Sequence, residues 1–168
     1  MNISVIVNYV SMYRAMYCVP SVNICQSAMI FAKDWADHLV KNNVFQHSPF
    51  MTFGENIAMH LVPVNYNETY YTLKSIDMWM SESPKYNFSR PGYSDTTGHF
   101  TALVWKSTKC IGFAAARSSS GKLMVVMKFY PPGNGNVKMF QSSVLHPSSC
   151  TTSSPPKHRI LKLFNNLN

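Results

Sequence analysis

The sequence is short of charged residues, and acidic residues are fewer than basic ones. Charged side chains make up 13% of the 168 residues, and Lys and Arg outnumber Asp and Glu by 15 to 7. The resulting net charge of +8 favours anionic partners such as phospholipid head groups, polyanionic glycans or nucleic acid. The same charge is equally compatible with a solvated face, so composition alone does not choose among these.

Long apolar runs and targeting signals are also missing. No stretch of about 18 apolar residues occurs, so the sequence predicts no membrane-spanning helix. The first ten residues have no basic region, and Asn8, Ser11 and Arg14 interrupt the apolar residues, which is unlike a signal peptide. N-myristoylation needs a glycine at position 2, where this chain has Asn2.

Cysteine is sparse, and its spacing excludes one common type of site. The four cysteines are Cys18, Cys25, Cys110 and Cys150, and no two of them form a Cys-x-x-Cys pair. We therefore expect no structural zinc site of the cysteine type. Two disulfides would suit a secreted domain of this size, but we expect reduced thiols.

The pattern of apolar residues predicts helices in the first half of the chain. Residues 8–18 and 67–81 are expected to be helical, the second helix with Asn67 as its N-cap. Apolar residues recur at steps of three and four over residues 28–39, which predicts an amphipathic helix that stops near Asn42 and Asn43. Residues 55–61 are expected to form a further helix.

Strands are expected in the second half. They cover residues 100–105, 111–116 and 123–130, the last two as an antiparallel hairpin. Helices followed by strands indicate the α+β class, with helices packed on an antiparallel sheet. We expect one domain over residues 8–138. Residues 139–168 contain many serines and prolines, so we expect a disordered, basic tail.

Two histidines and two glutamates are the candidate functional residues. His47 lies in a glycine-containing loop, and Glu55 follows this loop at the expected start of a helix. Glu82 follows Trp79 by three residues, and His99 follows Gly98 at the expected start of a strand. Two imidazoles and two carboxylates suit a divalent metal or an acid–base pair. Their spacing forces no contact between them, and a loop histidine is more often a surface residue, so this interpretation and the surface interpretation both stay open.

Several short runs together resemble a known family. They are Gly98-His99-Phe100-Thr101, Gly54-Glu55-Asn56, the pair Trp79 and Glu82, Val104-Trp105 and the segment from Pro131 to Asn134. In their order along the chain these runs resemble the CAP superfamily, the SCP-like domain of pathogenesis-related and allergen-like proteins, and most of all its Golgi-associated branch. The resemblance covers residues 8–138.

The resemblance implies a fold, a cleft and a set of ligands. The fold is a three-layer α-β-α sandwich with a central antiparallel sheet, and His47, Glu55, Glu82 and His99 match the residues of the family's cleft. In relatives the two histidines can hold Zn²⁺, which makes His47 and His99 the expected metal ligands here. Members of the family bind anionic phospholipid or sterol-like lipids, and the Golgi-associated branch forms homodimers.

Departures from the family pattern bear on the compartment. Secreted relatives have a cysteine where this chain has Met127, which favours the intracellular branch and reduced thiols. The lipid anchor of that branch needs a glycine where this chain has Asn2. We therefore expect an intracellular protein, peripheral at Golgi or other membranes, with an extracellular protein as the alternative if the amino terminus is incomplete or export needs no signal.

These observations favour a non-enzymatic module that binds acidic lipid surfaces or a small apolar ligand. The residues expected to contact anionic lipid are Lys106, Lys109, Lys128, Lys157, Arg159 and Lys162. A protein-interaction or oligomerising module is one alternative, and a metal-dependent hydrolase is another. No HExxH motif or known nucleophile motif supports the hydrolase. No nucleic-acid-binding motif occurs either, so we do not expect nucleic acid as a partner.

Overall fold

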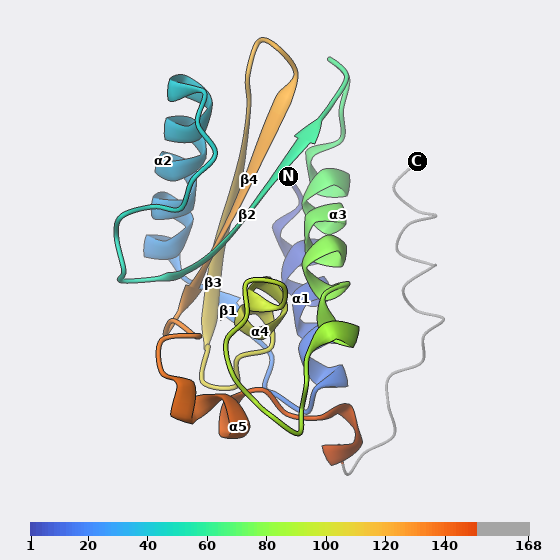
Figure 1. Cartoon of the computed structure of the whole chain (residues 1–168). Helices are drawn as coiled ribbons and strands as arrows, with labels where there is room; N and C mark the ends of the chain where they lie inside the picture. The colour runs from blue at the N-terminus through green and yellow to red at the C-terminus, as the bar shows by residue number, and fades with distance from the viewer. Residues whose placement is uncertain (151–168) are drawn as a thin grey trace.

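In the computed structural model a central sheet lies between helices (Figure 1). The structure describes residues 1–150. The helices are α1 (Ile3–Met16), α2 (Gln26–Asn42), α3 (Glu68–Met80), α4 (Gly98–Leu103) and α5 (Phe140–Ser143). The strands are β1 (Asn23–Ile24), β2 (Gly54–Leu61), β3 (Cys110–Arg117) and β4 (Lys122–Tyr130). The short 3-10 turns are η1 (Ser83–Lys85), η2 (Val137–Met139) and η3 (Pro147–Ser149).

The strand order of the sheet is β1-β3-β4-β2. The β3–β4 hairpin and the β2–β4 pair are antiparallel, whereas the two-residue strand β1 pairs with β3 in parallel. Gly121 in the hairpin turn has a φ of +85°, a conformation that glycine adopts without strain. This order makes β2 an edge strand, and the edge of β2 is where the cleft described below is built.

Helix α2 forms the layer on one face of the sheet. Its buried side chains, including Ala32, Trp35 and Leu39, pack against Ile57 and Val126 of the sheet. The backbone of α2 approaches β3 closely at Gly112, where a Cβ atom would lie 2.1 Å from the carbonyl carbon of Ala28.

Helices α1, α3 and α4 cover the opposite face (Figure 1). Alternate residues of β4 divide between the two layers. Leu123, Val125 and Met127 join the larger core, and Met124 and Val126 face α2. The architecture is the α+β sandwich expected from the sequence, with helices on both faces of a mixed sheet.

Several predicted elements are confirmed. Helix α2 contains the amphipathic segment 28–39 and ends at Asn42, and its C-cap Asn43 has a left-handed φ of 50°. Asn67 is the N-cap of α3, and its side chain accepts the Tyr70 N–H. The predicted hairpin of strands 111–116 and 123–130 is the β3–β4 pair.

Two predicted elements are wrong, and they exchange types. Residues 55–61, expected to be a helix, belong to strand β2, which pairs with β4 along its whole length. Residues 100–105, expected to be a strand, mostly belong to helix α4. Helix α4 is buried from Phe100 to Leu103, and the apolar periodicity of so short and fully buried a run does not separate a helix from a strand.

The cysteines also differ from the expectation of reduced thiols. All four are paired, Cys18 with Cys150 and Cys25 with Cys110, at Cα–Cα distances of 5.1 and 5.4 Å. The Cys25–Cys110 bond lies where β1 meets β3, next to the register pair Asn23 and Cys110. Widely spaced cysteines carry no pairing signal in the sequence, because the fold alone decides which of them meet.

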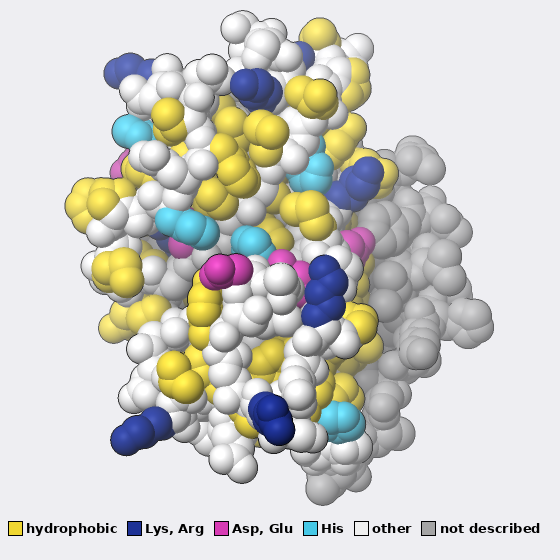
Figure 2. All heavy atoms as spheres, viewed as in Figure 1, with side chains coloured by type: hydrophobic (Ala, Val, Ile, Leu, Met, Phe, Trp, Pro, Cys, Tyr) yellow, Lys and Arg dark blue, Asp and Glu magenta, His cyan; other side chains and the backbone are white. Residues whose placement is uncertain are grey.

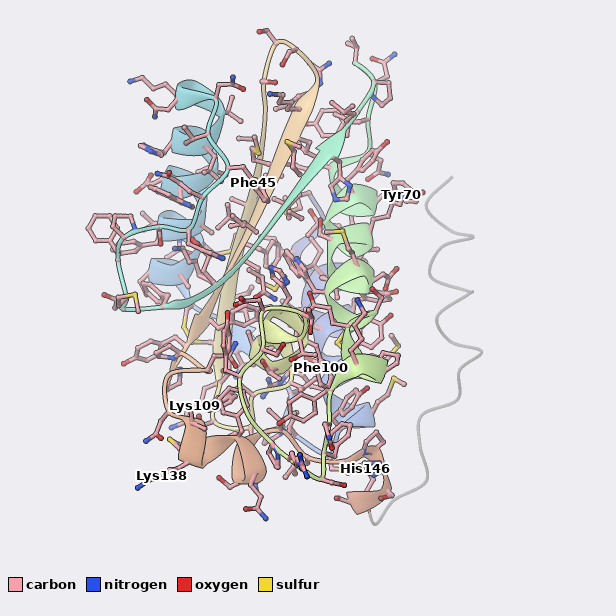
Figure 3. The ribbon with its side chains drawn as sticks, viewed as in Figure 1. Phe45, Tyr70, Phe100, Lys109, Lys138 and His146 are labelled. Atoms are coloured by element: carbon pink, nitrogen blue, oxygen red, sulfur yellow. A yellow bond between two sulfur atoms is a disulfide. The ribbon has the colours of Figure 1, made fainter. Side chains whose placement is uncertain are left out.

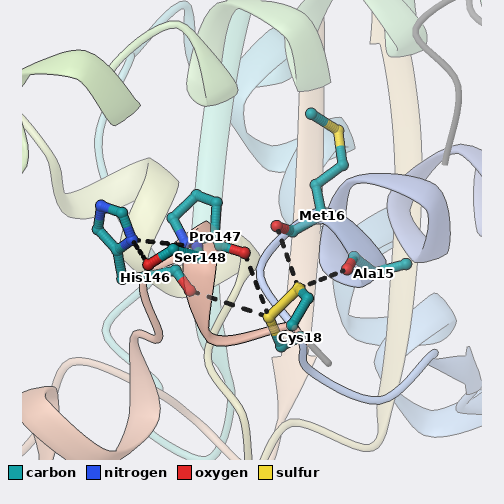
Figure 4. Close-up of a disulfide and its surroundings, with 7 residues drawn as sticks. Ala15, Met16, Cys18, His146, Pro147 and Ser148 are labelled. Carbon is teal, nitrogen blue, oxygen red and sulfur yellow. Dashed lines mark hydrogen bonds between the residues drawn. A yellow bond between two sulfur atoms is a disulfide. The ribbon is translucent and has the colours of Figure 1, made fainter. Parts of the chain in front are cut away.

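The Cys18–Cys150 bond holds the end of the described chain against the end of α1 (Figure 4). The Cys18 sulfur lies 3.8 and 3.7 Å from the carbonyl oxygens of His146 and Pro147, and the Cys150 sulfur lies 3.7 Å from that of Ala15.

The predicted domain boundary at residue 138 is therefore too early. Phe140 is fully buried, and its ring packs edge-on against Trp105 with the centroids 4.9 Å apart. Val144 is also buried. The packed unit extends to Cys150, and the rest of the expected tail, residues 151–168, lies outside the described residues.

Candidate functional site

The four candidate residues come from four segments of the chain. His47 lies in the loop between α2 and β2, Glu55 in β2, Glu82 directly after α3, and His99 in the first turn of α4. They line two adjoining cavities of about 280 and 520 Å³, and both histidines line both cavities. Histidine and acidic side chains gather near the centre of the face seen in Figure 2. The fold thus brings into one cleft residues that sequence spacing could not connect.

His47 and Glu55 form the first imidazole–carboxylate pair. The Nδ1 atom of His47 is 2.6 Å from Oε1 of Glu55, which also accepts the Ser48 backbone N–H at 2.9 Å. The other carboxylate oxygen accepts a hydrogen bond from Lys128 Nζ at 2.5 Å, and Lys128 also donates to Ser48 Oγ. The side chains of Lys128 and Glu55 are 1% and 6% exposed, so this ion pair is inside the protein.

The ion pair and the hydrogen bonds keep Glu55 charged. Burial on its own would raise the pKa of the Glu55 carboxyl, but the hydrogen bonds from His47, Lys128 and the Ser48 N–H outweigh burial and hold this pKa below its ordinary value. An ionised carboxylate only accepts hydrogen bonds, so His47 donates through Nδ1 and presents Nε2 as its remaining ring nitrogen. Glu55 therefore fixes the orientation of His47.

Glu82 and His99 form the second pair. Oε1 of Glu82 is 2.7 Å from His99 Nδ1, and Oε2 accepts the backbone N–H groups of His99 and Phe100, each at 3.0 Å. These N–H groups are free at the start of helix α4, where a negative charge is also favoured by the helix dipole. Glu82 thus stabilises the first turn of α4 and holds the imidazole that this turn carries.

Strand β2 separates the two pairs: Glu55 with His47 lies on the α2 side of the strand, and Asn56 reaches the His99 segment on the other side. Glu55 and Ile57 face the layer of α2, and Asn56, by strand alternation, faces the other way. Asn56 donates from Nδ2 to the His99 carbonyl at 3.0 Å, and Trp79 donates from Nε1 to the Ile57 carbonyl at 3.3 Å. The Trp79 and His99 rings are nearly parallel, with centroids 6.1 Å apart. Neighbouring residues of β2 therefore hold both histidines, Glu55 through the His47 ring and Asn56 through the His99 carbonyl.

Three residues of this network were not predicted as cleft residues: Asn56 and Asn134, which had no predicted role, and Lys128, which was expected to contact lipid. Asn134 donates from Nδ2 to the Gly98 carbonyl at 2.9 Å and accepts the Thr101 hydroxyl at 2.8 Å, which fixes the segment that bears His99. The signal for Lys128 was its place in the otherwise apolar run of β4, which is typical of a strand buried on both faces.

The donor atoms of the cleft suit a metal ion only in part. A carboxylate that orients a histidine through Nδ1 is the arrangement that metal-binding histidines use, and both His47 and His99 have it. Within residues 1–150, however, no group of three or more His, Cys, Asp or Glu side chains is placed to hold a metal. Two imidazole nitrogens alone would leave most of the coordination shell to water.

Nucleophilic catalysis has little support in the cleft geometry. Across the described part of the chain, neither His47 nor His99 forms a hydrogen bond with a hydroxyl or thiol group. Thr101, the hydroxyl residue nearest to His99 in the Gly-His-Phe-Thr run, is buried and donates to Gly98 and Asn134.

The larger cavity is mostly apolar away from the histidines. Phe45, Ile57, Met59, Met78 and Trp79 line it. Phe45, labelled in Figure 3, lies in the loop that precedes β2. This part of the cleft offers room for an apolar group next to His47 and His99.

The residues expected to contact anionic lipid fall into three groups. Lys106 and Lys109 are exposed. The expectation for Lys128 is wrong, because this side chain is buried under α2 in the ion pair with Glu55 and is not available to a membrane surface. The remaining expected contacts, Lys157, Arg159 and Lys162, lie outside the described residues.

No helix within residues 1–150 has both the length and the apolar character needed to cross a bilayer.

Comparison with known proteins agrees with this architecture. A family profile described as CAP, the cysteine-rich secretory protein family, matches residues 7–129. The chain is 36% identical over 139 residues to Golgi-associated plant pathogenesis-related protein 1 of Homo sapiens. This alignment covers 80% of this chain and 86% of that protein. The chain is 29% identical over 117 residues to a PR-1 type pathogenesis-related protein of Sambucus nigra, covering 65% of this chain and 64% of the relative.

Solved structures show the same fold at low identity. The crystal structure of NaASP2 with Zn²⁺ superposes with a TM-score of 0.67 at 17% identity and covers 88% of each chain. The crystal structure of hookworm platelet inhibitor superposes with a TM-score of 0.64 at 16% identity, over 90% of this chain and 82% of that one.

Proposed function

The chain belongs to the CAP family of cysteine-rich secretory proteins, and on that premise we propose that it is a non-catalytic module that binds the surface of anionic phospholipid membranes. The cleft is then a ligand site rather than a reaction centre. The observation that carries this proposal is the unequal distribution of charge along the chain and over the fold.

All acidic residues precede residue 96, and every charged residue after it is Lys or Arg. Residues 96–168 contain no Asp or Glu and nine of the 15 Lys and Arg residues. These nine are Lys106, Lys109, Arg117, Lys122, Lys128, Lys138, Lys157, Arg159 and Lys162. A surface built from this part of the chain has no carboxylates of its own to repel an anionic membrane.

Three of these lysines are exposed around one end of the molecule, and we call Lys106, Lys109 and Lys138 the basic end. Figure 3 labels Lys109 and Lys138 at this end, close to α5. The backbone N–H of Lys106 donates to the Ser143 carbonyl of α5 at 2.9 Å. Lysines near an anionic surface each contribute about 1 kcal/mol to binding. The basic end therefore supports an electrostatic attachment that Lys157, Arg159 and Lys162 would strengthen.

Charge reversal of the basic end tests the proposal. The variant Lys106→Glu/Lys109→Glu/Lys138→Glu should lose cosedimentation with phosphatidylinositol-containing vesicles at low salt. The matched control is Lys41→Glu/Lys74→Glu/Lys122→Glu, which changes the net charge equally at exposed or half-exposed sites nearer the other end of α2, α3 and the hairpin. Equal losses in both variants would point to net charge alone and contradict a defined surface. Binding unaffected by salt and by both variants would overturn the proposal.

The disulfides indicate on which side of a membrane the protein would bind. Paired cysteines persist in oxidising compartments. We therefore propose peripheral attachment on the lumenal or extracellular side, in agreement with the Golgi-associated name of the relative. Protease protection of the protein in isolated Golgi membranes would test this, and cleavage without detergent would contradict a lumenal location.

A second candidate function is the binding of Zn²⁺ in the cleft. The related NaASP2 has been solved with Zn²⁺, and in this chain the Nε2 atoms of His47 and His99 are the nitrogen donors left after the carboxylates hold Nδ1. With two protein donors we expect weak binding. Calorimetric titration with ZnCl₂ should give heat that is lost in both His47→Ala and His99→Ala. Heat that persists in the double variant would place any zinc elsewhere.

A further inference from the structure

The loop between α2 and β2 carries large apolar side chains that the fold leaves in solvent. Phe50 is 58% exposed and Met51 is 87% exposed. Single exposed apolar residues are common on protein surfaces. Here, however, they are adjacent, and they continue into other exposed aromatic residues.

Ring contacts connect the loop to the end of β4. The Phe31 ring of α2 contacts both Phe50 and Phe53, with centroids 6.3 and 5.2 Å apart. The Phe53 ring in turn contacts Tyr130, with centroids 5.8 Å apart. Phe31 and Tyr130 are 38% and 47% exposed, whereas Phe53 is buried beneath them. Phe31, Phe50, Met51 and Tyr130 thus form one exposed surface, which we call the Phe50 patch.

The Phe50 patch adjoins the basic end. Tyr130 is its last member along β4, and the Tyr130 carbonyl accepts the backbone N–H of Lys109 at 2.8 Å. Hydrophobic side chains run along the left edge of the face shown in Figure 2, with Lys or Arg side chains below them. An apolar patch beside lysines is the composition of surfaces that enter the interface of an anionic membrane.

The loop is fixed rather than free to fold the patch away. Trp35 donates from Nε1 to the Gln46 carbonyl at 3.1 Å, and Ser48 bonds to both Glu55 and Lys128. Phe53 anchors the other end of the loop in the protein. The exposed position of Phe50 and Met51 is therefore held by the same network that holds His47.

From these contacts we propose that the Phe50 patch enters the interfacial layer of an anionic phospholipid bilayer while the basic end binds the head groups. Asp34 lines the cavity of about 380 Å³ beside Phe31 and Phe50, so a carboxylate lies behind the tip of the loop. This limits insertion to the tip. The proposal rests on the membrane-binding function and adds to it an apolar contribution that salt does not screen.

The first test separates the apolar contribution from the electrostatic one. In vesicles of phosphatidylcholine and phosphatidylinositol, Phe50→Ser/Met51→Ser should weaken binding on the order of tenfold, because two partly exposed apolar side chains no longer leave water. The loss should remain in high salt. The matched control is Leu61→Ser/Val64→Ser, which removes two side chains that are 76% and 79% exposed outside the patch. Equal effects in the two variants would overturn the proposal.

The second test reports insertion directly. The three native tryptophans are all buried, so Phe50→Trp adds an exposed indole against a background shielded from lipid. Vesicles with brominated acyl chains should quench Phe50→Trp and leave Val64→Trp unquenched. Full vesicle binding without quenching of Phe50→Trp would overturn the inference and leave the membrane-binding function standing.

The remaining outcomes distinguish the membrane-binding function from the insertion of the Phe50 patch. Binding that needs the Phe50 patch but resists both salt and reversal of the basic end would overturn the electrostatic function and the role of the basic end, and would keep only the insertion of the Phe50 patch. No binding to any vesicle would overturn both. Light scattering without lipid distinguishes a second copy of this chain as the occupant: a dimer that Phe50→Ser/Met51→Ser converts to a monomer would assign the patch to self-association and overturn the inference.

Discussion

At the scale of single residues, the contact between Lys128 and Glu55 places the strongest energetic constraint on the cleft. Two opposite charges are withdrawn from water, and each is tolerated only because the other is present. Ser48 and His47 satisfy further hydrogen bonds of the pair. Removing one partner leaves a buried charge without compensation, whereas removing both leaves none.

A double-mutant cycle should show this coupling. Lys128→Met should lower the free energy of unfolding by about 3–5 kcal/mol, because Glu55 stays buried without its ammonium partner. Glu55→Gln/Lys128→Met should cost less than the sum of the two single variants. Urea unfolding at neutral pH measures all three. Additive losses would contradict a coupled pair.

The depressed pKa of Glu55 predicts a dependence of stability on pH. Because the folded state binds the proton more weakly than the unfolded state, Glu55 stabilises the fold above the ordinary glutamate pKa of about 4.3. This stabilisation is lost as the pH falls through the lower pKa of the folded state. Unfolding curves measured from neutral to acid pH should therefore be flatter for Glu55→Gln than for the parent protein. Parallel curves would contradict the assignment.

What the sequence revealed at this scale depended on where each residue's partner lies. The Gly98-His99-Phe100-Thr101 run and the Glu55 run identified the cleft residues through family resemblance. Lys128 was assigned to the surface, because its partner Glu55 is distant in sequence and becomes its neighbour only through the register of β2 with β4. Residue type alone favours an exposed lysine.

At the scale of elements, two close approaches hold helices against the rest of the fold. Glu82 accepts two N–H groups at the start of α4, and Gly112 lets α2 approach β3. The first approach explains why the apolar run after His99 is a helix, since a carboxylate from another element satisfies its first turn. No local pattern in residues 98–105 contains that information, whereas the β3–β4 hairpin is defined by its own turn and was predicted.

Gly112→Ala should disrupt the packing of α2 on the sheet. The added Cβ would meet backbone atoms of Ala28 and Met29 at 2.1 and 2.2 Å, so the helix has to move. We expect a loss of about 1–3 kcal/mol or more, as for overpacked cores. Gly135→Ala is the matched control, because no atom lies within 4 Å of its added Cβ. Thermal unfolding compares the two, and equal stabilities would contradict the close approach.

At the scale of the whole molecule, one disulfide joins the end of the described chain to the segment after α1, and the other joins the start of α2 to β3. Cys18–Cys150 spans 132 residues and Cys25–Cys110 spans 85. The sandwich with helices on both faces was predicted from the order of elements and the family resemblance. The pairing and the packed segment 140–150 were not, because both depend on which distant surfaces meet once the sandwich has formed.

The long Cys18–Cys150 loop predicts a large effect of its removal. A cross-link restricts the unfolded chain most when the loop is long, and removing a native disulfide typically costs about 2–5 kcal/mol. Cys18→Ser/Cys150→Ser should therefore lower the unfolding midpoint in urea and expose the buried Phe140 segment to limited proteolysis before the rest of the fold. Cys25→Ser/Cys110→Ser, which opens the shorter loop beside β1, should leave that segment protected.

Thiol titration of the unreduced parent protein in denaturant should find no free cysteine. Free thiols there, or equal cleavage after Phe140 in both variants, would contradict a covalent clamp at this end of the molecule.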